Sequence, residues 1–185
     1  MRIRHIADRD WDAVVALEAG AYFDDGLSEG PAALKSRADA SPGTCFVLEH
    51  GYRTAGYLLS LPYPMFRYPD LGRTEDTVLP SRNLHLHDLV IAEELRGRGL
   101  AKALLHHFTG TARSQGYEEI SLVAVSGSDT FWAANGYRAH REIAPPSGYG
   151  PDAVYMSRPV PGARAGSKNL VHASSHRTPM EDEVG

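Results

Sequence analysis

The stretch from Leu84 to Gly116 constrains the fold most strongly, because a glycine-rich turn in it separates two different hydrophobic periods. From Leu84 to Ile91 apolar and polar residues largely alternate, which is the period of two of a β-strand. After the turn, apolar residues recur with the spacing of one helix face, at Leu100, Leu104, Leu105, Phe108 and Ala112. The pattern predicts a strand, a tight turn and an amphipathic helix that ends at Gly116.

The turn, Arg96-Gly97-Arg98-Gly99-Leu100-Ala101, has the composition of an anion-binding turn. Amides in the first turn of a helix have no partners within the helix, and the helix dipole places partial positive charge there. Gly97 and Gly99 have no Cβ, so a phosphate group can approach the backbone closely. The third glycine of a dinucleotide-binding fingerprint is absent, and no Gly-Lys-Ser/Thr follows as in an NTPase loop. A purely structural turn is the alternative, which the two arginines and the amphipathic helix make less favoured.

This turn resembles the acyl-CoA-binding signature of the GCN5-related N-acetyltransferases (GNAT), Arg/Gln-x-x-Gly-x-Gly/Ala, through Arg96, Gly99 and Ala101. A second block, Phe131-Trp132-Ala133-Ala134-Asn135-Gly136-Tyr137, resembles the short aromatic helix and Gly-Phe/Tyr of that family. The resemblance covers residues 2–158 in organisation and 84–137 by motif. It implies that acetyl-CoA is the co-substrate and that the edge of the strand at Leu89, Val90 and Ile91 binds its pantetheine arm. Its pyrophosphate would be bound by the amides of Arg96, Gly97, Arg98, Gly99, Leu100, Ala101 and Lys102.

The remaining periodicity gives a mixed α/β (α+β) order. We expect strands at 2–6, 44–49, 54–61, 119–125, 137–143 and 153–157, and helices after Asp8 or Asp10, at 28–40 and at 130–135. The family resemblance implies a single domain with a mixed, mostly antiparallel twisted sheet flanked by helices. From residue 159 onward apolar periodicity disappears, so we predict a domain at 1–158 and a polar C-terminal tail at 159–185 outside the core.

Amino-acid composition and charge indicate which kinds of binding partner and which cellular compartment to expect. A net charge of −4 argues against a nucleic-acid binder or an anionic-membrane binder. The single cysteine, Cys45, excludes an internal disulfide framework, suits a reducing compartment and is expected to be buried. The start has no apolar signal core, and no 18-residue apolar run follows. We therefore expect a soluble, cytoplasmic protein without nucleic-acid or membrane partners; the sequence leaves a homodimer open.

Acetyl transfer to an amine needs a base, because an alkylammonium has a pKa of about 10.4. His85 and His87 stand at i and i+2, so both should point to one face of the strand, with Asp88 facing the other side. Satisfied sheet histidines are the alternative, and two ligands without a third predict no metal site. The run His85-Leu86-His87 also resembles the His-Leu-His strand of arylalkylamine (serotonin) N-acetyltransferases. That resemblance implies a proton path through His85 and His87.

One position departs from the family pattern. Many members place a tyrosine, the acid for the CoA thiolate, four residues before the glycine of the second block, where this chain has Trp132. An indole is a hydrogen-bond donor but not a useful acid. Ser128, Tyr137 or Tyr149 could substitute, or the thiolate leaves unprotonated or takes a proton from water. A strand amide near Val90 or Ile91 could hold the oxyanion.

Two loops are candidates for the acceptor side. The segment 21–30 is a plausible substrate-side loop, although solvated carboxylates are the commoner explanation for its acids. The aromatic segment 62–69 either packs on the core or walls the acceptor pocket.

These observations predict an acetyl-CoA-dependent N-acetyltransferase that acts on a primary amine of a small molecule by direct attack in a ternary complex, with no acyl-enzyme. A protein or peptide N-acetyltransferase is one alternative. A CoA-binding sensor or interaction module without catalysis is the other.

Overall fold

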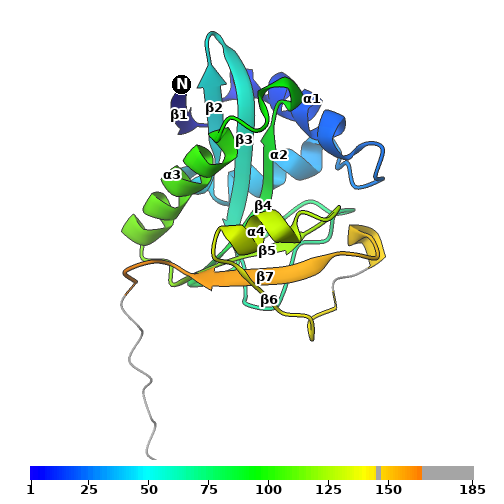
Figure 1. Ribbon diagram of the computed structural model, residues 1–185, viewed down its shortest axis with the longest axis vertical. Coiled ribbons are helices and arrows are strands. Elements are labelled where there is room, and N and C mark those ends of the chain that lie inside the picture. The colour runs from blue at the N-terminus through cyan, green and yellow to red at the C-terminus, as the bar shows by residue number, and fades with distance from the viewer. Residues whose placement is uncertain (145–146, 164–185) are drawn as a thin grey trace, which may run out of the picture.

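The computed structural model describes residues 1–144 and 147–163. Within these residues seven strands form one sheet in the order β1-β2-β3-β4-β5-β7-β6 (Figure 1). The strands are β1 (Arg2–His5), β2 (Phe46–His50), β3 (Arg53–Pro62), β4 (Asn83–Ile91), β5 (Glu119–Ala124), β6 (Arg138–Ala139) and β7 (Val154–Pro159). β4 and β5 pair in parallel, whereas the other neighbouring strands pair antiparallel. The predicted single domain with a mixed, mostly antiparallel sheet is confirmed.

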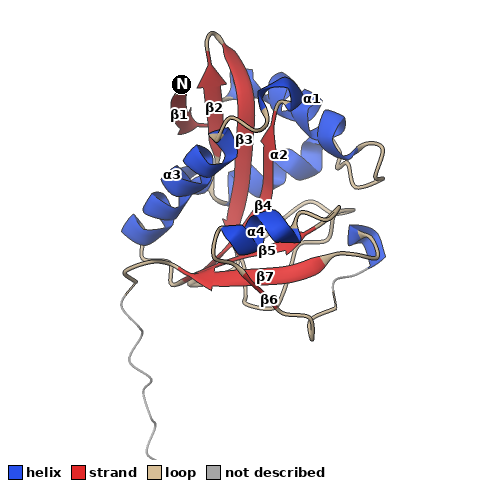
Figure 2. Ribbon diagram, viewed as in Figure 1, coloured by secondary structure: helices blue, strands red, loops and turns tan. Residues whose placement is uncertain are grey.

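Helices cover both faces of the sheet (Figure 2). The sheet therefore separates two clusters of core residues, one on each face. The helices α1 (Trp11–Tyr22) and α2 (Pro31–Ala40) pack on one face, where Val14 and Leu34 meet Tyr57. The helices α3 (Leu100–Ser114) and α4 (Asp129–Ala134) pack on the other. The predicted face of α3 is confirmed, because all five of its apolar residues are buried: Leu100, Leu104, Leu105, Phe108 and Ala112.

The sheet opens between β4 and β5. These strands pair only where 83–85 meet 119–121. Beyond that point β4 continues along β3, while β5 continues along β7, which runs across the direction of β4 in Figure 1. The divergence leaves one edge of β4, from Leu86 to Ile91, without a neighbouring strand from β5.

A β-bulge lies in this part of β4. Leu59 of β3 faces Asp88 and Ser60 faces Leu86, so His87 is the extra residue. A bulge interrupts the alternation of a strand and re-aims side chains. As a result Asp88 faces α1, and the prediction that it points away from the histidine side is wrong: Tyr22 of α1 donates a hydrogen bond to it at 2.7 Å.

The ends of some elements differ from the sequence prediction. β6 covers only 138–139 and not 137–143, because the chain turns where Ile143 donates to the carbonyl of His140. β7 reaches Pro159, and Val160 is buried in the core, with its amide bonded to the carbonyl of Glu118 at 2.8 Å. Contacts with the core therefore continue past residue 158, and the division into a domain at 1–158 and a tail at 159–185 stays a prediction. The rest of the predicted tail, 164–185, lies outside the described residues.

The aromatic segment 62–69 packs on the core. Tyr68 contacts the ring of Tyr149 and Phe66 contacts the ring of Tyr155, with centroids 5.7 and 5.9 Å apart. Among the described helices, none is both long and apolar enough to cross a membrane.

Candidate active site

A cleft of about 400 Å³ opens where β4 and β5 diverge. One wall is β4 from Leu86 to Ile91, and the opposite wall is the end of β5 together with α4. Residues of α1 and of the segment 21–30 line a third side. The predicted substrate-side loop therefore does border the cleft, and Asp25 in it accepts a hydrogen bond from the Ser126 hydroxyl of the opposite wall at 2.6 Å.

The glycine turn forms one end of the cleft. Gly97 and Gly99 have φ values of 75° and 77°, a left-handed conformation that glycine adopts without steric cost. Gly99 is the N-cap of α3, and no side chain in the described part of the chain caps this helix end. The amides of the first turn are therefore free to bind an anion. Arg96 ties the turn to the strand, since its Nε donates to the carbonyl of Ile91 at 3.2 Å.

The predicted cofactor-binding residues do not all lie in one place. Those that line the cleft are Leu89, Val90, Ile91, Arg96 and Ala101. Gly97, Arg98 and Gly99 are exposed at its end, and Leu100 is buried beneath them as an anchor of α3. Lys102 instead lines a second hollow between α3 and the end of β7, together with Arg113 and Arg158.

His87 lines the cleft and is hydrogen-bonded to a carboxylate. Its side chain is only 2% exposed, and its Nε2 lies 2.5 Å from Oε1 of Glu29. Its other ring nitrogen, Nδ1, is buried and has no hydrogen-bond partner among the described residues. His87 therefore has one nitrogen engaged by a carboxylate and one available.

His85 lies deeper and does not line the cleft. Its Nδ1 is 3.0 Å from the hydroxyl of Ser121, and its ring stacks on Tyr155. Burial lowers the pKa of His85 well below 6.5, and the neighbouring His87 and Arg37 lower it further. His85 is therefore neutral near pH 7. The ring centroids of His85 and His87 are 6.4 Å apart.

Asp88 borders the cleft and is an unusually weak acid for an aspartate. Burial raises its pKa to about 6, although hydrogen bonds from the hydroxyls of Tyr57 and Tyr22 favour the ionised form. The bulge thus places a carboxyl group of shifted pKa directly beside His87.

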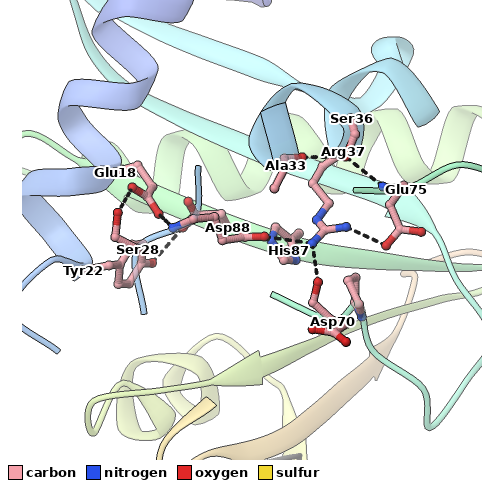
Figure 3. Close-up of polar contacts among 12 residues, drawn as sticks. Glu18, Tyr22, Ser28, Ala33, Ser36, Arg37, Asp70, Glu75, His87 and Asp88 are labelled. Atoms are coloured by element: carbon pink, nitrogen blue, oxygen red, sulfur yellow. Dashed lines mark hydrogen bonds and ion pairs between the residues drawn. The ribbon is translucent and has the colours of Figure 1, made fainter. Parts of the chain in front are cut away.

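A buried ion-pair network supports Glu29. Arg37 of α2 is fully buried and bonds Oε2 of Glu29 at 2.8 Å and Oε1 of Glu75 at 2.7 Å. It also donates to the carbonyl of Asp70 at 2.8 Å (Figure 3). Burial raises the pKa of Glu29, but the charges of His87 and Arg37 outweigh it and hold that pKa below its usual value. Glu29 is therefore ionised.

Comparison with known proteins identifies the family. The family model described as the acetyltransferase (GNAT) family matches residues 11–137, which is more than half of the chain. The chain belongs to the GNAT acetyltransferase family. Members of this family are acyl-CoA-dependent N-acyltransferases. No curated protein matches the chain by sequence.

Solved structures share the fold. The GNAT-like decarboxylase GphF, in complex with isobutyryl-CoA, is 21% identical with a TM-score of 0.68, over 86% of this chain and 100% of that one. N-acetylglutamate synthase from Neisseria gonorrhoeae, complexed with coenzyme A and N-acetyl-glutamate, is 15% identical with a TM-score of 0.66, over 86% of this chain and 35% of that one. The ribosomal-protein-S18-alanine N-acetyltransferase from Escherichia coli is 15% identical with a TM-score of 0.56, over 90% of this chain and 97% of that one. Two of these structures contain a CoA compound, so the GNAT fold binds CoA.

At the position of the usual GNAT tyrosine, Trp132 is buried and lines the cleft. Of the three proposed substitutes, Ser128 and Tyr149 line the cleft and Tyr137 does not. The Tyr149 hydroxyl donates to the carbonyl of Pro69 at 2.6 Å. Burial raises the pKa of both tyrosines, which makes them weaker acids. Cys45 is buried as expected, and burial raises its pKa to about 12, so it is no nucleophile near neutral pH.

Sequence reasoning missed the partners that surround His87 and Asp88. Glu29 was within the segment 21–30, but nothing in the sequence distinguished it from the exposed acids Asp24 and Asp25. Arg37 gave no signal, because a single arginine in a polar helix is usually solvated. Tyr22 and Tyr57 reach Asp88 from α1 and β3, across 66 and 31 residues of sequence.

Proposed function

We propose that this GNAT protein transfers an acetyl group from acetyl-CoA to a primary amine of a small molecule, by direct attack in a ternary complex. One observation carries the proposal: the cleft that begins at the amide-rich turn before α3 also contains a histidine held by a buried carboxylate. The first feature suits a pyrophosphate, and the second suits the removal of a proton from an ammonium group.

The turn fits the CoA pyrophosphate because its two left-handed glycines leave the first-turn amides of α3 accessible. The open edge of β4 at Leu89, Val90 and Ile91 would hold the pantetheine arm through backbone hydrogen bonds. The acetyl thioester would then lie deeper in the cleft, near His87. An amide of this strand segment would stabilise the oxyanion.

His87 takes one proton from the ammonium group of the acceptor, which leaves a nitrogen lone pair for attack. The N–C bond forms, the C–S bond breaks and CoA leaves as a thiolate. The amide nitrogen loses its second proton, and the sulfur takes up a proton directly or from water. No residue is acylated, in keeping with the buried thiol of Cys45.

His85 is proposed as the second member of a proton path. Its ring is 6.4 Å from that of His87 between centroids, so a proton would cross a bridging water. The hydroxyl of Ser121 lies beyond it, 3.0 Å from its Nδ1.

A small acceptor is favoured over a peptide because the cleft is walled on several sides. The Asp25–Ser126 hydrogen bond joins two of its walls, and Leu71 lines it from the loop that Arg37 anchors. Acidic groups at Glu18, Glu29 and Asp88 favour a cationic acceptor.

The test is release of CoA thiol from acetyl-CoA with arylalkylamines, polyamines, amino acids and short peptides, with CoA affinity measured on the same sample. Release with a small amine supports the proposal. Release with peptides alone supports a protein N-acetyltransferase, and tight CoA binding without release supports a sensor. Absence of CoA binding would overturn the proposal at its first step.

The histidine roles are tested by pH profiles. His87→Ala should lower kcat/KM by about 10²- to 10⁴-fold near pH 7 and by less at high pH, where more of the amine is already neutral. His85→Ala should show a smaller loss with the same pH trend. Equal losses at all pH values would contradict a role in proton transfer.

A further inference from the structure

We propose that Glu29 is a positioning residue that fixes the tautomer of His87, so that Nδ1 is the nitrogen that accepts the proton of the amine. This inference rests on the proposed function for its kinetic part. The tautomer itself is a property of the free protein.

The hydrogen-bond network determines which nitrogen carries the proton. Glu29 is ionised, because its pKa is lowered despite its burial, and Arg37, which stays charged whatever the state of His87, bonds its Oε2 at 2.8 Å. An ionised carboxylate only accepts hydrogen bonds. Its Oε1 lies 2.5 Å from Nε2 of His87, so Nε2 is the donor and carries a hydrogen. In the neutral imidazole, Nδ1 then has the free lone pair.

The free nitrogen is also the one that lacks a partner. Nδ1 of His87 is buried and makes no hydrogen bond to any described residue, although the side chain lines the cleft. A buried acceptor without a partner is unfavourable and is uncommon in folded proteins. An N–H group of the acceptor amine, or a water between the two, would satisfy it.

Two helices hold Glu29 in place. Arg37 of α2 binds its Oε2 at 2.8 Å and is itself held by Glu75. The backbone amide of Glu29 donates to Oε1 of Glu18 on α1 at 2.5 Å, and Ser28 donates to the other oxygen of Glu18 at 2.7 Å. The carboxylate is therefore positioned before any acceptor binds, which is what a catalytic hydrogen-bond network requires.

Charged and titratable groups surround His87. Glu29, Arg37 and Glu75 together carry one net negative charge. The other charged or titratable groups packed near His87 are Asp88, Glu18 and Tyr22 on the α1 side, and neutral His85 on β4. Glu29 is in direct contact with His87 and faces it in the cleft wall.

The decisive variant is Glu29→Gln, which keeps the shape and removes the charge. The amide can either accept from Nε2 or donate to it, so the tautomer is no longer fixed. We expect kcat/KM at pH 7 to fall roughly 10-fold or more. The acidic limb of the pH profile of kcat/KM should move to lower pH by about one unit. The affinity for CoA should be unchanged.

The matched control is Glu75→Gln. This substitution removes the charge of the other carboxylate that is bonded to Arg37, and Glu75 does not contact His87. The acidic limb of the pH profile of kcat/KM should lie at the same pH in this variant as in the wild type. If Glu75→Gln moves the limb as far as Glu29→Gln does, the effect belongs to the whole network and the inference fails.

A second readout needs no substrate. ¹⁵N NMR of the histidine rings, with His87 assigned by the signals that vanish in His87→Ala, reports which nitrogen carries the hydrogen. We expect Nε2–H in the neutral wild type and a mixture in Glu29→Gln. A neutral wild-type ring with Nδ1–H would overturn the inference even if an amine is acetylated. The Nε2–H tautomer together with no acetylation of any amine would instead count against the proposed function.

Discussion

Asp88 combines burial with two phenolic hydrogen-bond donors, and its burial has a consequence for stability. Its pKa is raised from 3.8 to about 6. The folded protein therefore binds this proton more tightly than the unfolded chain does. The stability that Asp88 contributes is fully present below pH 4 and is lost as the pH rises through 6.

The variant Asp88→Asn should remove this pH dependence. A shift of about two pKa units corresponds to about 3 kcal/mol, which is the most that ionisation can cost above pH 6. The amide oxygen can accept from one tyrosine, and the amide nitrogen can donate to the other. In urea unfolding the variant should gain about 2 kcal/mol over the wild type at pH 7.5 relative to pH 4.5, because the unfolded carboxyl is already largely ionised at pH 4.5. A stability difference that is the same at both pH values would show that ionisation of Asp88 costs nothing.

Gly99 is the residue on which the anion site depends most directly. Its φ of 77° disfavours any side chain, so each substitution there costs about 1–2 kcal/mol of strain. Asp and Asn tolerate this region better than other residues and have the same shape. Gly99→Asp should weaken CoA binding in calorimetry at least about tenfold more than Gly99→Asn, because only aspartate places a charge among phosphate-binding amides. Equal affinities of the two folded variants would contradict the assignment of the turn.

At the scale of single elements, the sequence predicted what local backbone physics determines. The strand, the turn with Gly97 and Gly99, and the buried face of α3 follow from short-range periodicity and left-handed φ values, and they match the structure. The bulge at His87 does not follow, because it depends on pairing with β3. A period of two, continued through the bulge, therefore placed Asp88 on the wrong face.

The element α2 shows why half of the candidate site was missed. Arg37 reaches Glu29 and Glu75 across 8 and 38 residues of sequence, and Glu29 reaches His87 across 58. No periodic pattern encodes such pairs. The predicted catalytic and cofactor-binding residues lie within one continuous stretch, whereas the partners found only in the structure come from α1, α2, the loop between them, β3 and the loop that carries Glu75.

Arg37 makes α2 an anchor for the loop that carries Asp70 and Glu75. Arg37→Met should lower the free energy of unfolding in urea by about 3–5 kcal/mol, because the buried carboxylate of Glu29 and the partly buried carboxylate of Glu75 lose their partner. Lys35→Ala on the same helix breaks an exposed pair with Asp39 and should cost only about 0.3–0.5 kcal/mol. If both variants lose similar amounts, the buried network does not stabilise this face of the molecule.

At the scale of the whole molecule, the cleft lies where the sheet divides. One part of the sheet is β1 to β4 and the other is β5, β7 and β6, joined by a short parallel pairing at 83–85. A CoA molecule bound along the open edge of β4 would contact both parts. Sequence predicted this organisation through the family motif, but not the acceptor, whose surroundings come from segments distant in the chain.

Binding of CoA should therefore stabilise both parts of the sheet together. At a concentration of 100 times Kd, CoA should stabilise the native state by about 2.7 kcal/mol, which for a domain of this size raises Tm by roughly 5–10 °C. Hydrogen exchange should slow most in β4 at 86–91 and at the end of β5 and just past it, at 122–126, and should slow least at the β1–β2 edge. Adenosine 3′,5′-bisphosphate lacks the pantetheine arm, so it should leave exchange at 86–91 unchanged. Protection of α3 alone by intact CoA would mean that the cofactor does not enter between the diverging strands.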